Sequence, residues 1–311
     1  MVFSFLLPMR KGGLGSLVCY NRDMNVSIHV SMQTIHRLKR MQELLEQLDP
    51  NAPPRALVAP GSPVLCGTVI VFPGSFNPPT TAHLALMKQA RDVIRFQAWS
   101  TGKPEIVHLY AAISKHIVDK ESVERPLLLD RVLLLDNLLS RRFSHAGILL
   151  FNRGLYVEQA QAVRVAFPQV NRLLFLVGFD KIVQILDPHY YVDRDASLHE
   201  LFALAELLVA PRGSEGKQSL DELLHRPENL PFARYIHILP FDPAYRDISS
   251  THIRQHPGSY RREIPHEVQR FMRETRAYAP PLRLPGGSEI DFYAERVKLL
   301  EMLLRSVSSE K

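Results

Sequence analysis

A hydroxyl and an imidazole three residues apart mark the first segment that could carry chemistry. Thr80 and His83 come at the start of a predicted helix, after the turn-rich residues 74–79, which follow an apolar run. Side chains three residues apart share one face of a helix. The first turn of a helix also presents free N–H groups and the positive end of its dipole to anions. The segment is therefore typical of a polyphosphate site at the carboxyl end of a buried strand.

A second segment of the same kind lies far along the chain. Ser249, Ser250 and Thr251 stand where a helix is predicted to begin, and Arg254 follows one turn later. Hydroxyl side chains at such positions cap helices, and a guanidinium can make paired hydrogen bonds to phosphate oxygens. Taken alone, the three hydroxyl residues indicate no more than a helix cap. The phosphate interpretation depends on their occurring together with the first segment.

The two segments together resemble the nucleotidyltransferase superfamily. Residues 74–83, GSFNPPTTAH, are similar to its GxFxPxHxGH signature, in the form closest to nicotinamide and nicotinate mononucleotide adenylyltransferases. Residues 247–254, DISSTHIR, resemble the ISSTxIR motif of the same branch. The residues that fall on the first pattern are Gly74, Phe76, Asn77, Pro78, Thr80 and His83. Thr80 replaces the first histidine of the signature and Ala82 replaces its usual glycine, and the resemblance extends over about residues 67–278.

The resemblance implies a reaction and a role for each of these residues. ATP would be joined to nicotinamide or nicotinate mononucleotide, giving NAD or its deamido form and pyrophosphate. The attacking phosphate is already an anion, so the protein would align two anions and stabilise the developing charge without a general base. His83 would act at the α-phosphate, with a purely structural histidine as the alternative. The remaining residues implied to hold the phosphates of ATP are Thr80, Gly74, Ser75, Phe76, Ser249, Ser250 and Arg254.

Two further residues are implied near the bound nucleotides. Asp180 follows the predicted strand that ends at Gly178, and VGFD resembles the family's GxD segment, in which the acid lies near the nucleoside. The resemblance implies that Asp180 binds ATP or the ribose of the substrate. The alternative is an acid in the first turn of a helix. Arg212 follows another strand end, where the family often carries a basic residue that approaches ATP. An ordinary surface arginine is the alternative there.

Four residues are candidates for binding the acceptor. Lys115 and Lys120 follow a strand at the expected active edge, and Arg131 matches an arginine of the family's next helix. A solvated surface charge is the alternative for each. Tyr156, in GLYVE, stands where the family often has a TWE-like segment that stacks the pyridine ring, and a core tyrosine is the alternative. The acceptor's base is therefore left open by the resemblance.

The expected cofactor is Mg²⁺, carried by the phosphates of ATP. Mg²⁺ prefers phosphate and water ligands, and the sequence contains no protein-only metal cluster. Other nucleotide and hydrolase signatures, including the P-loop GxxxxGK[ST], GxGxxG, HExxH and GxSxG, are also absent from the sequence. The predicted partners are thus ATP and a mononucleotide, bound without a protein metal site.

The elements that must position these residues alternate along the chain. Short apolar runs rich in β-branched residues predict strands at Thr68–Phe72, Ile106–Ala111, Gly147–Phe151, Arg172–Val177, Leu207–Ala210 and Tyr235–Leu239. Helical periodicity lies between them near residues 81–97, 127–140, 155–166 and 180–187, and again at 264–276. Such alternation favours an α/β fold, a Rossmann-like doubly wound parallel sheet with flanking terminal helices.

Three regions are predicted along the chain. Residues 1–66 form an N-terminal extension, with an amphipathic helix at 31–49 and a proline-rich linker at 50–66. Residues 67–278 form the nucleotidyltransferase domain. Residues 279–311 are a C-terminal linker followed by a helix at about 289–306. The role of both terminal regions is open.

The composition limits the remaining function classes. Hydrophobic residues make up 46% and charged residues 23% of 311 residues, which is ordinary for a soluble enzyme. No segment is long and apolar enough for a membrane helix. The net charge of +6 comes without a basic run interleaved with aromatics, so nucleic-acid binding is disfavoured. Two cysteines without metal spacing fit a reducing compartment, so the cytoplasm is expected, with mitochondrion and nucleus left open. A homo-oligomer is equally left open.

Two rival functions are also compatible with these patterns. The first is a transferase of the same superfamily that uses CTP or a different phosphorylated acceptor, such as phosphopantetheine. The second is a nucleotide-binding or ATP-hydrolysing protein that acts through partners, with its terminal helices as docking elements. The presence of Thr80 and His83 together with Ser249, Ser250 and Arg254 argues against a chain that has lost catalysis.

Overall fold

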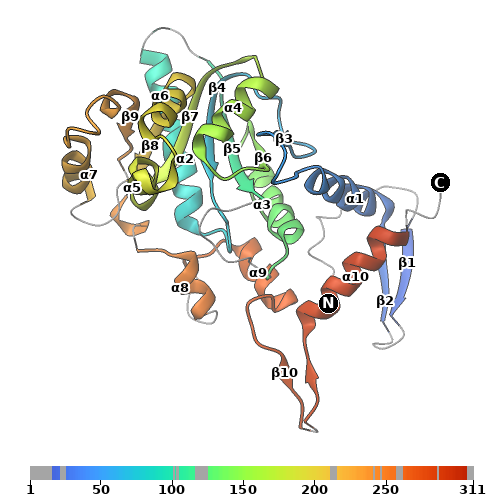
Figure 1. Cartoon of the computed structure of the whole chain (residues 1–311). Coiled ribbons are helices and arrows are strands. Elements are labelled where there is room, and N and C mark those ends of the chain that lie inside the picture. Colours follow the sequence, from blue (N-terminus) through green and yellow to red (C-terminus); the bar gives the residue numbers. More distant parts are fainter. Residues whose placement is uncertain are drawn as a thin grey trace.

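A seven-stranded, mostly parallel sheet forms the centre of the molecule (Figure 1). The computed structural model describes residues 16–21, 26–100, 102, 105–115, 125–210, 216–240, 242–245, 247–256, 262–285 and 287–306. The strands of the central sheet are β3 (Ala56–Val58), β4 (Gly67–Pro73), β5 (Val107–Ser114), β6 (Ala146–Phe151), β7 (Val170–Gly178), β8 (Glu206–Ala210) and β9 (Ile236–Ile238). Their order is β3-β6-β5-β4-β7-β8-β9, and every neighbouring pair is parallel except β3 with β6.

The sheet reverses its winding direction at β4. From β4 the chain adds β5 and β6 on one side, and then returns to add β7, β8 and β9 on the other. All six predicted strands are present, and the predicted α/β fold with a doubly wound sheet is confirmed. In sheets of this kind ligands bind outside the carboxyl ends of the strands at the point of reversal. The structure therefore directs attention to the ends of β4 and β7.

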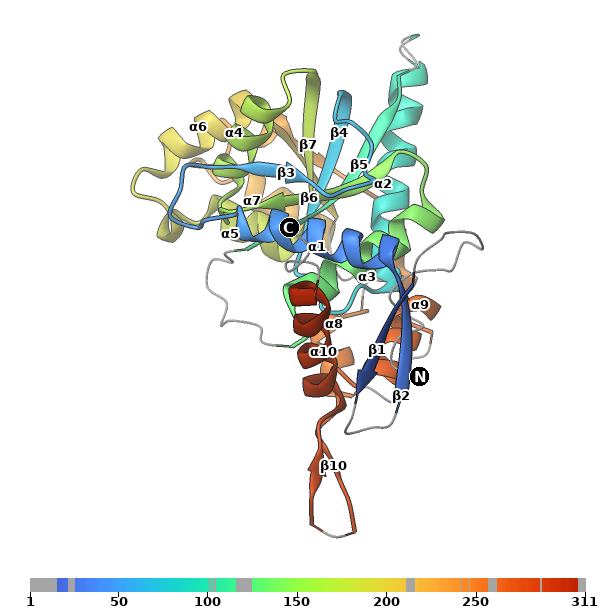
Figure 2. The same ribbon diagram turned by 90° about the vertical axis from the view of Figure 1, so that its right-hand side faces the viewer.

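Helices cover both faces of the sheet because successive strand residues point to opposite sides. Ile70 and Phe72 face one apolar cluster, whereas Val69 and Val71 face the other. The first face is covered by α1 (Met32–Glu46), α2 (Thr81–Ser100) and α3 (Leu128–Arg142). The second face is covered by α4 (Tyr156–Ala166), α5 (Phe179–Leu186), α6 (Arg194–Leu204) and α7 (Gly216–Leu224) (Figure 2).

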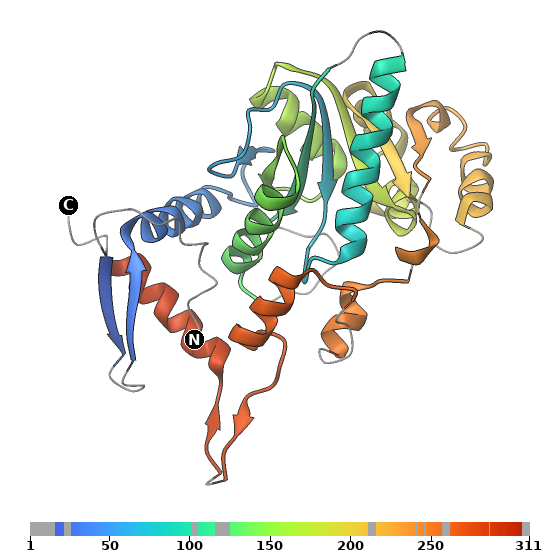
Figure 3. The same cartoon turned by 180° about the vertical axis from the view of Figure 1, so that it is seen from behind.

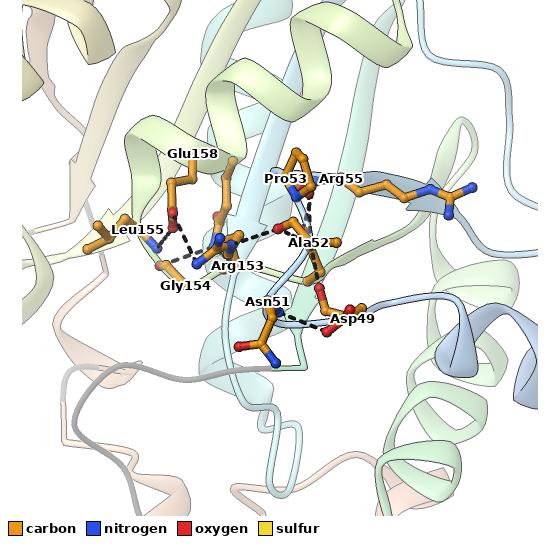
Figure 4. A network of polar contacts seen from close by, with 11 residues as sticks. Asp49, Asn51, Ala52, Pro53, Arg55, Arg153, Gly154, Leu155 and Glu158 are labelled. Atoms are coloured by element: carbon orange, nitrogen blue, oxygen red, sulfur yellow. Dashed lines mark hydrogen bonds and ion pairs between the residues drawn. The ribbon is translucent and has the colours of Figure 1, made fainter.

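Residues before position 67 pack together with the central sheet and its helices. Helix α1 contributes to the same core as α2 and α3, and β3, inside the stretch predicted as linker, adds an antiparallel edge strand to β6. The side-chain amide of Asn152 donates hydrogen bonds to the carbonyl oxygens of Asp49, Ala52 and Pro53. Arg153 Nε also donates to the Ala52 carbonyl oxygen, at 3.1 Å (Figure 4). Residues 49–58 are thus part of the packed unit. The sequence did not predict β3, because a strand of three residues after two prolines is too short to show an alternating pattern.

A further layer lies beyond the carboxyl ends of the strands. It consists of α8 (Ser250–Gln255), α9 (His266–Thr275) and α10 (Phe292–Ser306), with the hairpin β10 (Leu282–Arg283) and β11 (Glu289–Ile290) extending away from the body (Figure 3). The other elements are the hairpin β1 (Ser16–Asn21) and β2 (Val26–Ser31) and the 3-10 turns Pro188–Tyr190, Ala233–Tyr235 and Pro243–Tyr245. Among the described helices, none has the length and apolarity to cross a membrane.

Candidate active site

The loop between β4 and α2 is held in a tight, fully packed conformation. The Gly74 N–H donates to the Ala112 carbonyl oxygen at 2.9 Å, which continues the β4–β5 pairing past the end of the strand. A Cβ atom at Gly74 would lie 3.1 Å from the Phe76 ring, so a larger residue at this position would press on that ring. Phe76 has a φ of 44° and is 1% exposed. Its ring lies 5.2 Å from the ring of His83 between centroids, so the loop supports the imidazole directly.

Thr80 and His83 form one hydrogen-bonded unit at the start of α2. His83 Nδ1 lies 3.0 Å from the Thr80 backbone nitrogen, which donates to it, and 2.7 Å from the Thr80 hydroxyl. Because Nδ1 accepts the backbone hydrogen bond, the proton of the neutral ring is on Nε2. Thr80 is fully buried. In this structure its hydroxyl orients His83, whereas the sequence predicted that it holds a phosphate.

The second motif packs against the first across the active edge. The Ser250 hydroxyl donates to the Pro78 carbonyl oxygen at 2.8 Å, and Arg254 Nη1 donates to the Asn77 carbonyl oxygen at 2.5 Å. Ser249 is the N-cap of α8 without a side-chain cap hydrogen bond, so the expected hydroxyl cap is not formed there. The two segments singled out in the sequence therefore meet in space. In this structure, however, one side of the Arg254 guanidinium holds the loop.

Asn77 joins this loop to two other parts of the chain. Its side chain is buried, Nδ2 donates to the Arg125 carbonyl oxygen at 3.4 Å, and Oδ1 accepts from the Tyr278 hydroxyl at 2.6 Å. Burial raises the pKa of Tyr278, so this hydroxyl is a donor at neutral pH. Asn77 falls on the sequence motif, but no sequence pattern indicated a role for Asn77, Arg125 or Tyr278. A buried asparagine must find hydrogen-bond partners, and this requirement was the one indication that Asn77 joins other parts of the chain.

Arg131 brings a buried positive charge to the same loop. It is 6% exposed, and its Nη1 donates to the Ser75 carbonyl oxygen at 3.2 Å. Burial lowers its pKa, although a guanidinium remains charged at neutral pH. Its Nε has no hydrogen-bond partner, and none of its contacts in the described part of the chain is a carboxylate. A buried cation without a counter-ion attracts an anion.

A pocket opens beside this loop at the carboxyl ends of β4 to β7. About 800 Å³ of space lies between its walls, and part of that space is open to solvent. Its walls are Pro73, Gly74, Ser75, Ser114, Gly154, Leu155, Tyr156, Gln159, Lys181, Gln184, Ile185, Tyr190 and Tyr191. Tyr156 packs edge-on against Phe175, with 5.3 Å between ring centroids. The pocket therefore combines aromatic side chains with the loop that holds His83.

Gln159 is a pocket residue that no sequence motif indicated. Its Nε2 donates to Ser114 Oγ at 3.0 Å and to the carbonyl oxygens of Arg153 and Gly154 at 3.3 Å. Because backbone carbonyls can only accept, these contacts fix which end of the amide carries the hydrogens. Its Oε1 is buried without a hydrogen-bond partner. A glutamine on the otherwise apolar inner face of a helix was the signal that could have identified it.

The remaining candidates are spread around the active edge. Lys115 Nζ donates to the Leu45 carbonyl oxygen at 3.0 Å, at the end of α1, so this contact directs it toward α1. Asp180 is exposed in the first turn of α5, and the next residue, Lys181, lines the pocket. Arg212 and Lys120 lie outside the described residues. Of the predicted acceptor residues, the structure brings Tyr156 to the pocket and Arg131 to the adjoining loop.

Comparison with known proteins agrees with this arrangement. A family model described as "Cytidylyltransferase-like" matches residues 71–256, which is more than half of the chain and includes both motifs. A search of curated proteins finds no match to the chain. The matched span begins within β4 and ends just after α8, so it contains the loop, the pocket and the buried arginine.

Proposed function

The chain belongs to the cytidylyltransferase-like family of nucleotidyltransferases, and from this premise we propose that it transfers the adenylyl group of ATP to nicotinamide or nicotinate mononucleotide. The observation that carries the proposal is the position of the pocket, whose walls include Gly74 and Ser75 of the loop that supports His83. An acceptor whose ring lies among the tyrosines would have its phosphate at that loop. The form of residues 74–83 and 247–254 supports ATP as the nucleotide.

The proposed reaction is a single in-line displacement. An oxygen of the acceptor phosphate forms a bond to the α-phosphorus of ATP as the bond to the β-phosphate oxygen breaks, and pyrophosphate leaves with its electron pair. The Nε2–H of His83 donates to an oxygen of the α-phosphate, where charge develops. Arg131 and backbone N–H groups of residues 75 and 76 neutralise and align the phosphates. No proton has to be removed from the nucleophile.

Mg²⁺ fits this proposal as a companion of ATP. The described residues contain no group of three histidine, cysteine, aspartate or glutamate side chains that could hold a metal ion. The phosphates and water would therefore supply its ligands, as Mg²⁺ prefers. When bound, it would supply neutralisation of charge on the leaving pyrophosphate.

The proposal is tested with a panel of substrates. Purified protein is incubated with ATP or CTP, Mg²⁺, and one of three acceptors: nicotinamide mononucleotide, nicotinate mononucleotide or phosphopantetheine. We expect dinucleotide and equimolar pyrophosphate from ATP with a pyridine mononucleotide, and the ratio of kcat/KM values then gives the amide or acid preference. Product from CTP or from phosphopantetheine alone would replace the proposed substrate while retaining the reaction class.

Replacing Arg254 with alanine should mainly raise the KM for ATP, by about tenfold, because hydrogen bonds to charged groups contribute about 1.5–3 kcal/mol. In this structure Arg254 also holds the Asn77 carbonyl oxygen, so a smaller loss of kcat should accompany the change. Steady-state kinetics with ATP varied at saturating acceptor measures both constants. Arg254→Lys should recover only part of the affinity, because an ammonium lacks the planar pair of donors. An unchanged KM would show that Arg254 only supports the loop.

Replacing Tyr156 with leucine should raise the KM for the acceptor by about twofold to tenfold, the size of an aromatic stacking contribution. The KM for ATP should not change, because Tyr156 lines the pocket that this proposal assigns to the acceptor. Tyr156→Phe keeps the ring and should behave like the wild type. Equal effects of leucine and phenylalanine would point to the hydroxyl instead, and an effect on ATP alone would contradict the placement of the acceptor.

A further inference from the structure

Helix α10 lies outside the residues that match the family, yet it is joined to α3 by a buried ion pair. Arg296 Nη2 and Asp130 Oδ1 are 2.6 Å apart, and the two side chains are 2% and 1% exposed. Asp130 is in the first turn of α3 and directly precedes Arg131. The family match ends at residue 256. The C-terminal helix therefore contacts the matched domain next to its buried arginine.

Tyr293 makes a second connection between the same two helices. Its hydroxyl donates to Asp130 Oδ2 at 2.8 Å and accepts from the backbone N–H of Leu127 at 2.6 Å. Leu127 is the N-cap residue of α3 and has no side-chain cap hydrogen bond of its own. Tyr293 thus satisfies one of the free N–H groups at the start of α3, and fixes the first turn of that helix from outside.

The residue that begins α10 makes a third connection. Asp291 accepts hydrogen bonds from the backbone N–H groups of Tyr293 and Ala294, which places it as the N-cap of α10, and it pairs with the Arg125 guanidinium. The Arg125 carbonyl oxygen in turn accepts from Asn77 Nδ2. One residue beyond Asp130, Arg131 donates to the Ser75 carbonyl oxygen. Both ends of the loop at residues 75–77 are therefore linked to α10. Ser75 is linked through Arg131 and its neighbour Asp130, and Asn77 is linked through Arg125.

Stability alone is a poor explanation for these contacts. A buried ion pair often contributes no more than apolar residues of the same volume, because both charges lose their hydration. The pair in this structure is also incompletely satisfied, since Arg296 Nη1 is buried without a hydrogen-bond partner. The polar contacts instead fix the orientation of the first turn of α3. The apolar packing of Leu303 and its neighbours on α10 is not directional, so it cannot fix that orientation.

We propose that α10 is a positioning element for nucleotidyl transfer, which holds Arg131 and the 75–77 loop in place for the phosphates of ATP. Tyr293 and Arg296 act through Asp130. Asp291 acts through Arg125. The inference rests on the proposed function for the identity of the nucleotide. It assigns to the C-terminal region a role that the family match does not include. None of the α10 residues is proposed to touch substrate.

The experiment compares variants of the full chain by two independent readouts, the Kd for Mg-ATP from calorimetry and kcat from product formation. Arg296→Met removes one half of the pair, and Tyr293→Phe removes a single oxygen atom and keeps the ring. We expect a rise in the Kd for ATP of at least about threefold and a fall in kcat of about tenfold, because small misplacements far from the reacting atoms can cost up to about 10²-fold. Measurements are made at a temperature where circular dichroism shows each variant to be folded.

Two control variants on the same helix separate positioning from stability. Leu303→Ala removes a fully buried side chain of α10 but leaves the polar contacts intact, so it should lower the melting temperature without changing Kd or kcat. Lys298→Ala changes an exposed residue and should alter nothing. Wild-type values for Tyr293→Phe and for folded Arg296→Met would overturn the proposal, as would equal effects of Leu303→Ala. A chain that binds ATP but forms no dinucleotide would refute the proposed acceptor, and the Kd comparison would still decide the role of α10.

Discussion

Replacing His83 with alanine should lower kcat by about 10²–10⁴-fold, the range found when one positioned donor or proton-transfer group is lost from an active site. The Phe76 ring supports the imidazole, and Thr80 fixes its tautomer so that Nε2 carries a hydrogen. The alanine variant keeps the helix and the loop glycine. We therefore expect an intact fold, an almost unchanged Kd for ATP and a loss confined to turnover.

The matched control for this variant is His225→Ala, which changes an exposed histidine just after α7. It should keep wild-type turnover. Pre-steady-state measurement of pyrophosphate release would show whether the loss in His83→Ala lies in the chemical step. A fall in kcat of less than about fivefold would be far below the effect of losing a transition-state donor. It would show that His83 is a structural histidine.

Replacing Arg131 with methionine should lower kcat/KM for ATP by about 10–10²-fold, since hydrogen bonds to charged groups contribute about 1.5–3 kcal/mol. The side chain is buried, its Nε has no hydrogen-bond partner, and it forms no ion pair with a carboxylate in the described part of the chain. Methionine has a similar length and suits a buried position. Removing an unpaired buried charge should therefore leave stability unchanged or raised while it weakens nucleotide use.

Arg141→Met on the same helix provides the control, because Arg141 is exposed near the other end of α3. That variant should match the wild type in kcat/KM. Arg131→Lys keeps the charge but not the guanidinium geometry, and should fall between the two. Loss of folding in Arg131→Met, without a change in the kcat/KM of the protein that remains folded, would contradict a role in phosphate binding.

The sequence was sufficient for the sheet but not for its edges. The runs that became β4 and β7 are almost continuously apolar because both faces of the sheet are covered, and such runs are easy to detect. Strand β3 has three residues and follows two prolines, so it has no period to detect. Its place depends on Asn152, which lies 99 positions beyond Pro53 in the sequence. Helix α6 was also not predicted, although Asp193 caps it.

The sequence predicted only those residues of the candidate site that lie in local motifs. Motif spacing singled out Thr80, His83 and Arg254, because each of them lies within about one turn of the start of a helix. The partners of Asn77 are Arg125 and Tyr278, which are separated from it by 48 and 201 positions, and no local pattern connects them. The same holds for the contact between Arg296 and Asp130. Local periodicity gives the face on which a residue lies, whereas tertiary packing decides which residue it meets.

The most direct test of the central claim is the fate of two labels on ATP. Full-length protein is incubated with nicotinamide mononucleotide, Mg²⁺ and ATP that carries one radioactive label at the α-phosphate or, in a parallel reaction, at the γ-phosphate. Adenylyl transfer predicts that the α-label appears in the dinucleotide and the γ-label in pyrophosphate, in equal amounts. Recovery of the γ-label as inorganic phosphate and of the α-label as ADP would show ATP hydrolysis instead, and would contradict the proposed reaction.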